Sequence, residues 1–171
     1  MVLREVTRMV GVVPNAAYRR FADRDALLGA VRDKAVKELA ARMAARMGQV
    51  RAAPHTPTGA RLRLQAVGST YLDFARNEPG LFDTAFTNTS HDAAGDGTDE
   101  PTPLDLLQSA LDNLVSAGIL ASDRRPNIEY PIWASVHGLA VLLRGPLQSL
   151  PEREKKRLEG QMLAFIGAAV S

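Results

Sequence analysis

The stretch VGVVPNAAYRRFADRDALL, residues 10–28, brings a glycine, a proline, two aromatic rings and several arginines close together. Gly11 suits the left-handed backbone that often ends a helix, and Pro14 suits the first turn of the next helix. We therefore expect two short helices, over residues 2–9 and 14–21, joined by a tight turn.

A longer helix is expected directly after this pair, over residues 24–47. Asp23 is a suitable N-cap for it, because the carboxylate can accept one of the free backbone N–H groups. Apolar residues then recur every three or four positions, as one face of an α-helix requires. The expected inner face consists of Leu28, Val31, Ala35, Leu39, Met43 and Met47.

The chain divides after this helix. The segment RAAPHTPTG, residues 51–59, holds two prolines and a glycine, which interrupt the helical pattern. We expect a first domain over residues 1–50 and a second over residues 58–171, with an acidic loop at residues 90–101. The helices expected in the second domain cover residues 60–77, 80–88, 102–117, 127–144 and 152–170.

The composition favours helices throughout. Alanine and leucine dominate, and no strand-like alternation or internal repeat is present. The 171 residues are 46% hydrophobic, enough for one core that buries about two-thirds of the unfolded surface. The sequence therefore predicts an all-α protein.

Basic residues gather in the first part of the chain. Residues 1–51 carry 11 Lys and Arg against 5 Asp and Glu, whereas residues 52–171 carry 10 against 14. This asymmetry is typical of a polyanion-binding module joined to a different kind of body. A solvated helix surface would produce the same counts, so charge alone leaves both readings open.

Two short helices, a tight turn and a longer packing helix make a helix-turn-helix arrangement. In that motif the second helix enters the major groove of DNA, and neighbouring groups bind phosphates. Antiparallel helix pairs with a glycine turn are also common without DNA, so the pattern leaves that alternative open. The candidate DNA-binding residues are Pro14, Asn15, Ala16, Tyr18, Arg19 and Arg24.

The residues themselves are more specific than the pattern. The segment REVTRMVGVVPNAAYRRFADRDALLGAV resembles the DNA-binding region of tetracycline-repressor-like regulators, with similarity over residues 3–31. A weaker resemblance covers residues 71–86 and the segment WASVHG, residues 133–138, which is similar to the Trp-His-Gly-bearing ligand domain of one branch of that family. The family's outline falls here on Gly11, Val12, Tyr18, Phe21, Arg24, Leu27 and Leu28.

Two departures from the family are expected to matter. Val13 stands where the family has Ser or Thr, and a lost N-cap costs about 1 kcal/mol. Family members also have a helix before the residue that matches Leu3, so the first helix of the module is expected to be absent. A late start site, a truncated chain or a real loss of DNA binding would each explain that absence.

The second domain holds the candidate ligand site. The resemblance implies a pocket for a small apolar or amphipathic ligand, and Trp133 and His137, four residues apart, share a helix face. The alternative is a plain core, in which Trp133 fills volume and His137 hydrogen-bonds a neighbour. The candidate ligand-binding residues are Phe74, Phe82, Phe86, Leu107, Leu111, Trp133 and His137.

The last two expected helices are apolar over more than one face, so they must be central or paired. The family resemblance implies a homodimer formed through these two helices. A two-fold dimer also suits a palindromic DNA site. The final helix presents a stripe made of Leu158, Met162, Phe165, Ile166 and Ala169.

Several classes of protein are not favoured. The chain has no cysteine, which excludes disulfides, thiol nucleophiles and cysteine-based metal sites. No catalytic motif, apolar signal segment or membrane-length apolar run is present, and the acidic loop around His91 and Asp92 is a weak candidate for metal. We expect a cytoplasmic protein that is not an enzyme, with no catalytic residues, cofactor or metal site.

Together these patterns predict a homodimeric, ligand-responsive transcriptional regulator. We expect a repressor that binds double-stranded operator DNA and is released by a small apolar ligand. The alternative is a helical dimer that binds a small ligand or a protein partner but not DNA, in which the N-terminal module is vestigial or truncated.

Overall fold

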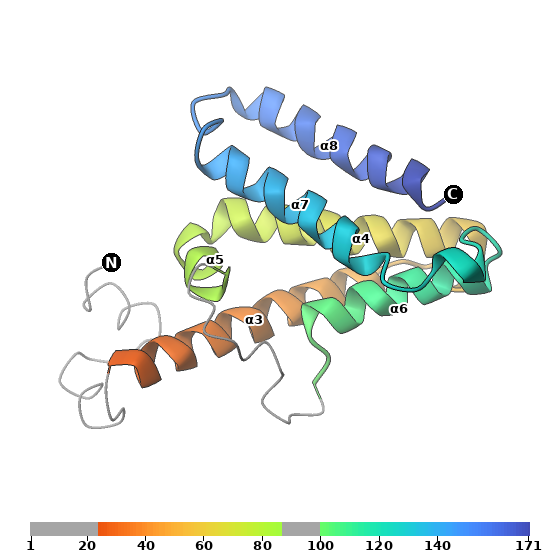
Figure 1. Ribbon diagram of the computed structural model, residues 1–171, viewed down its shortest axis with the longest axis horizontal. Helices are drawn as coiled ribbons and strands as arrows, with labels where there is room; N and C mark the ends of the chain where they lie inside the picture. Colours follow the sequence, from red (N-terminus) through yellow and green to blue (C-terminus); the bar gives the residue numbers. More distant parts are fainter. Residues whose placement is uncertain (1–23, 87–99) are drawn as a thin grey trace.

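The computed structural model describes residues 24–86 and 100–171, and within these ranges all regular secondary structure is helical (Figure 1). The prediction of an all-α fold is confirmed. The predicted helices over residues 2–9 and 14–21 lie outside the described residues, as do residues 90–99 of the acidic loop. The elements are α3 (Arg24–Gly48), α4 (Pro57–Asn77), α5 (Pro79–Phe86), α6 (Pro103–Ser116), the 3-10 turn η1 (Ser122–Arg124), α7 (Glu129–Arg144) and α8 (Glu152–Ala169).

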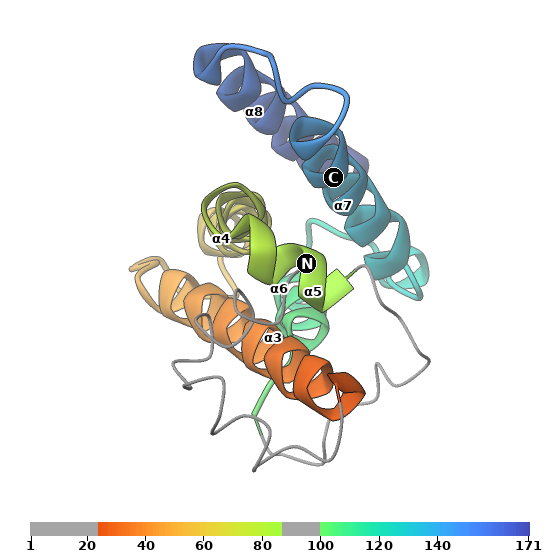
Figure 2. The same ribbon diagram turned by 90° about the vertical axis from the view of Figure 1, so that its left-hand side faces the viewer.

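Helix α4 is the centre of the described part, because it contacts α3, α5, α6, α7 and α8. Helix α3 packs on one side of it, and the antiparallel pair α7–α8 packs on the opposite side (Figures 1 and 2). Helix α6 runs beside both α3 and α4. The end-on view of Figure 2 therefore shows α4 between α3 and the α7–α8 pair.

Threonine–proline pairs start two of the helices. The Thr56 hydroxyl accepts a hydrogen bond from the Gly59 N–H at 3.1 Å, and Pro57 occupies the first turn. Thr102 and Asp105 form a reciprocal capping box at the start of α6. The sequence predicted α4 from residue 60, and the helix begins three residues earlier because this cap lies inside the proline-bearing segment.

The inner face of α3 is buried largely as predicted. Val31, Ala35 and Leu39 are fully buried, and Met43 and Met47 continue the same row. The first position differs: Leu27 is 4% exposed, whereas Leu28 is half-buried. A spacing of four residues runs from Leu27 to Met47, so Leu27 extends the buried row.

The last helix divides its apolar residues between two directions. Ile166 is 4% exposed and faces the core, whereas Phe165 is 65% exposed. On α7, Val141 and Leu142 are also about half exposed, at 48% and 46%. The α7–α8 pair therefore has one apolar face inside the protomer and presents further apolar side chains to solvent.

Candidate ligand-binding site

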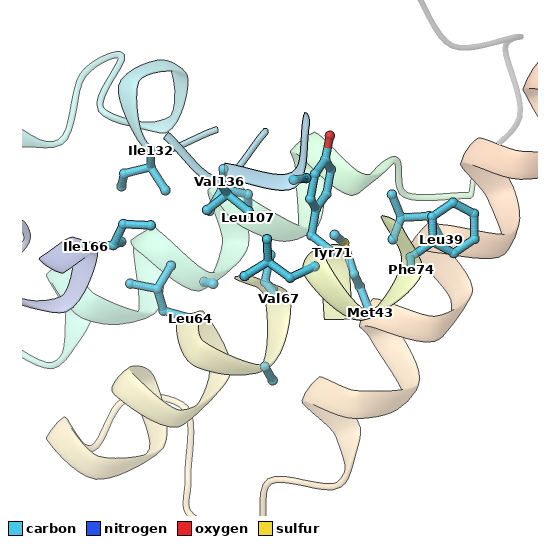
Figure 3. Packing of buried hydrophobic residues seen from close by; sticks show 14 of the residues in the cluster. Leu39, Met43, Leu64, Val67, Tyr71, Phe74, Leu107, Ile132, Val136 and Ile166 are labelled. Carbon is cyan, nitrogen blue, oxygen red and sulfur yellow. The ribbon is translucent and has the colours of Figure 1, made fainter. Parts of the chain in front are cut away.

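A cavity of about 410 Å³ lies between α4, α6, α7 and α8. Its wall is mostly aliphatic, and the side chains come from helices far apart in the sequence. Figure 3 shows Leu64, Ile132 and Ile166 directed toward one another from α4, α7 and α8. The other buried aliphatic residues in the wall are Val67, Leu107, Leu114, Val136 and Val170.

Gly68 lets α8 lie close to α4 along this cavity. A Cβ atom at Gly68 would stand 2.6 Å from Cδ2 of Leu163. With glycine at this position, the Leu163 side chain packs against α4 and forms part of the cavity wall. A larger residue at position 68 would require the end of that flexible side chain to move.

Tyr71 carries the polar centre of the site. Its hydroxyl is 2.8 Å from Nδ1 of His137 and accepts a longer hydrogen bond, 3.4 Å, from Nε1 of Trp133. Tyr71 and Trp133 both line the cavity. Two residues of α7, one turn apart, are therefore joined to the same atom of α4.

Burial determines the protonation states of Tyr71 and His137. It lowers the pKa of His137 and raises the pKa of Tyr71, so both side chains are neutral near pH 7. Because the Trp133 N–H can only donate, the Tyr71 oxygen accepts there and its own proton is free for Nδ1 of His137. When Tyr71 donates to Nδ1, the neutral imidazole carries its proton on Nε2.

An aromatic cluster surrounds His137 on the side of α5. The imidazole stacks on Phe82, with ring centroids 5.6 Å apart and an interplanar angle of 24°. Phe86 lies 5.6 Å from His137 and 6.5 Å from Trp133 between ring centroids. Tyr71 contacts both phenylalanine rings, so one residue belongs to the cavity wall and to this cluster.

Comparison with known proteins identifies the domain that contains the cavity. The family model of the tetracyclin repressor-like C-terminal domain matches residues 64–165, more than half of the chain. The chain belongs to the tetracycline-repressor-like family. The family expected from the sequence is thereby confirmed, and it is a family of transcriptional regulators. The match covers the C-terminal domain, so the resemblance of residues 3–31 to a DNA-binding region stays a prediction.

A solved structure shares the fold of this chain. A protein with unknown function from Rhodococcus sp. RHA1 matches with a TM-score of 0.65 and 21% identity, covering 99% of this chain and 84% of that chain. No curated protein matches. Within the described residues, no helix is long and apolar enough to cross a membrane.

The residues predicted to bind a ligand fall into three groups. Leu107 and Trp133 line the cavity. Phe82, Phe86 and His137 form the aromatic cluster next to it. The remaining two, Phe74 and Leu111, are buried in the core at 1% and 0% exposure, and Figure 3 shows Phe74 beside Leu39 on the α3 side. Ligand contact by any of the seven stays a prediction.

Sequence reasoning did not select several residues of the wall. Leu64, Val67 and Tyr71 lie on one stripe of α4 at helical spacing, and this stripe was visible in the sequence. The contributions of Leu163 and Ile166 were not visible, because they depend on how α8 crosses α4.

Most of the residues predicted to bind DNA lie in a part of the chain that the structure does not describe. Pro14, Asn15, Ala16, Tyr18 and Arg19 lie outside the described residues. Arg24 begins α3, and Figure 1 places that end of α3 at the periphery of the helical body.

Proposed function

We propose that this chain is a ligand-responsive, DNA-binding transcriptional regulator that acts as a homodimeric repressor. A small apolar ligand would occupy the cavity and release the protein from its operator. The observation that carries the proposal is an apolar cavity of about 410 Å³ inside the domain that the regulator family shares.

DNA binding is assigned to residues 1–50, and ligand binding and dimerisation to residues 58–171. The excess of Lys and Arg over residues 1–51 supports the first assignment. By family resemblance, Tyr18 and Arg24 bind phosphates and Arg19 lies at the major groove.

The exposed face of the α7–α8 pair supports dimerisation. Phe165 is 65% exposed, and an exposed apolar patch usually marks an interface. On α7, Gly138 has no described atom near the position of a Cβ and does not line the cavity, so a second copy can approach the backbone closely there. A two-fold dimer would present two DNA-binding modules to a palindromic site.

The cavity has a physical route to the DNA-binding module. It lies against α4, and α4 packs directly on α3, whose first residue is Arg24. A ligand that fits better when α4 and the α7–α8 pair adopt one spacing would shift the population toward that spacing. Trp133, His137 and Gly138 match the Trp-His-Gly pattern of one branch of the family, to which we assign the chain.

Selection from a pool of random palindromic duplexes tests the proposal. The chain from Met1, and the same chain extended by the residues encoded upstream, should enrich one sequence in at least one of the two forms. Its affinity should fall steeply with salt, because each neutralised phosphate releases counterions. Arg19→Ala should weaken binding, whereas Arg153→Ala, an exposed change on α8, should not.

The rival function is a helical dimer that binds a ligand or a protein partner but not DNA. If neither form of the chain enriches a sequence, the regulator proposal is wrong and the rival stands. If Arg153→Ala weakens DNA binding as much as Arg19→Ala, the assignment of Arg19 to the DNA contact is wrong.

A further inference from the structure

We propose that the ligand of this cavity is an amphipathic carboxylate, an aliphatic chain with one anionic head group bound by Arg61. The inference rests on the proposed function and names the chemical class of the ligand.

The cavity is elongated along α4. Its lining on that helix runs from Arg61 to Tyr71, ten residues apart, which corresponds to about 15 Å of helix. A volume of about 410 Å³ at roughly 30 Å³ per water-sized atom accommodates about 14 non-hydrogen atoms, the size of dodecanoate. The space therefore suits an extended chain.

Arg61 carries the only charged side chain among the described residues that line the cavity. No Asp or Glu side chain in the described wall could neutralise a cationic ligand. A cation would leave water for an apolar space and meet a like charge at its end, which is unfavourable. An anion meets an opposite charge at the same place.

Arg61 and Gln65 are free to bind a ligand. They stand one turn apart on α4, both are exposed, and neither has a hydrogen-bond or ion-pair partner among the described residues. Arg63, on another face of the same helix, instead donates to the backbone oxygens of Val50, Ala52 and Gly59. Arg63 thus binds the loop that precedes α4, whereas Arg61 makes no such hydrogen bonds among the described residues.

The C-terminal end of α8 leaves Arg61 available. Helix α8 runs antiparallel to α4, with Leu163 opposite Gly68, so Ser171 stands near the level of Arg61. The backbone oxygen of Ser171 accepts a hydrogen bond from Arg124 at 3.0 Å. The Ser171 oxygen therefore already has a hydrogen-bond donor other than Arg61.

The single positive charge of Arg61 favours a carboxylate, which carries one negative charge, over a phosphate monoester, which carries nearly two. The guanidinium can donate two parallel hydrogen bonds to the carboxylate oxygens, and the Gln65 amide can add a third. At the other end of the cavity, the Tyr71 hydroxyl is already bonded to Trp133 and His137. The polar end of the ligand is therefore expected at Arg61 and its methyl end near Tyr71.

Trp133 provides the readout, because it is the only tryptophan of the chain and lines the cavity. The experiment titrates the full chain with dodecanoate, dodecanol and dodecyltrimethylammonium below their micelle concentrations. Tryptophan fluorescence and calorimetry measure binding. Dodecanoate should bind about tenfold more tightly than dodecanol, because a charged hydrogen bond is lost in the alcohol, and the cation should bind most weakly.

Two variants separate the role of Arg61 from general apolar binding. Arg61→Gln should lower the affinity for dodecanoate about tenfold and leave the affinity for dodecanol unchanged. Arg153→Gln, which removes an exposed charge away from the cavity, should change neither. Both positions are exposed, and circular dichroism will verify that each variant is folded.

The proposal is overturned if dodecanoate does not bind, if dodecanol binds as tightly, or if Arg61→Gln leaves the preference for the acid intact. Its failure is distinguishable from failure of the regulator function. Release of DNA by a neutral ligand but not by dodecanoate would support the regulator function and refute the carboxylate ligand. Binding of dodecanoate through Arg61 by a protein that never binds DNA would support the carboxylate ligand and refute the regulator function.

Discussion

Replacing Tyr71 by Phe should destabilise the protein by about 1–2 kcal/mol. The change removes one oxygen atom from a side chain that is 4% exposed and leaves the ring in place. That oxygen joins α4 to α7 through His137 at 2.8 Å and Trp133 at 3.4 Å. The substitution therefore tests whether this polar contact holds the two helices together.

The magnitude follows from the two distances and from burial. The contact with His137 is a normal hydrogen bond, worth about 1 kcal/mol net, whereas the longer contact with Trp133 contributes less. Leaving the partners unpaired adds a desolvation cost. Because His137 and Trp133 are only half-buried, water replaces part of the lost bonding and the total stays near the lower end of the range.

Urea unfolding of the full chain, at one fixed protomer concentration, measures this effect. Thermal unfolding gives a second measure, because a chain of this size should lose about 2–4 °C in Tm for each kcal/mol of destabilisation. The decisive comparison is a double-mutant cycle with His137→Phe, which keeps a ring against Phe82. The double variant should be about 1 kcal/mol more stable than the sum of the two single effects predicts. In the double variant the Tyr71 hydroxyl and the His137 imidazole are both absent, so neither is left without its hydrogen-bond partner. Effects that add within about 0.3 kcal/mol would show that the hydrogen bond does not couple the helices, and the reasoning would be refuted.

Three further predictions concern pH, a helix start and the exposed face. Burial lowers the pKa of His137 below its usual 6.5, so just below pH 6.5 the unfolded chain binds more protons than the folded chain. The free energy of unfolding should therefore fall as the pH drops through this range. The variant His137→Phe should lose this part of the pH dependence in urea unfolding. Thr102→Ala should cost about 1 kcal/mol in urea unfolding because it breaks the capping box, and Ser109→Ala, exposed on the same helix, should stay within about 0.5 kcal/mol of the parent. Phe165→Asp should shift the protein toward monomer in sedimentation analysis, because it places a charge on the proposed dimer face, whereas Gln148→Asp in the turn before α8 should not; equal dissociation by both would locate the dimer contact elsewhere.

The sequence identified the candidate site only in part, and for a definite reason. Trp133 and His137 could be placed on one face of a helix because a spacing of four residues fixes their mutual direction. Their common partner, Tyr71, lies 62 and 66 residues earlier in the chain, and no local pattern connects such positions. Phe74 is an aromatic residue of the same helix as Tyr71, yet it is directed to the α3 side, since one helix carries side chains to several neighbours.

What the sequence determined by itself was local and periodic. The spacing of apolar residues set the helices and the buried row of α3, and the Thr–Pro pairs set where α4 and α6 begin. The tertiary structure decided which helices meet. Gly68 shows the difference: the sequence records a glycine within a helix, but only the tertiary structure shows that the Leu163 side chain of α8 packs against it, beside an apolar cavity. Contacts between distant segments depend on the relative position of whole helices, and that position is determined by the packing of all of them together.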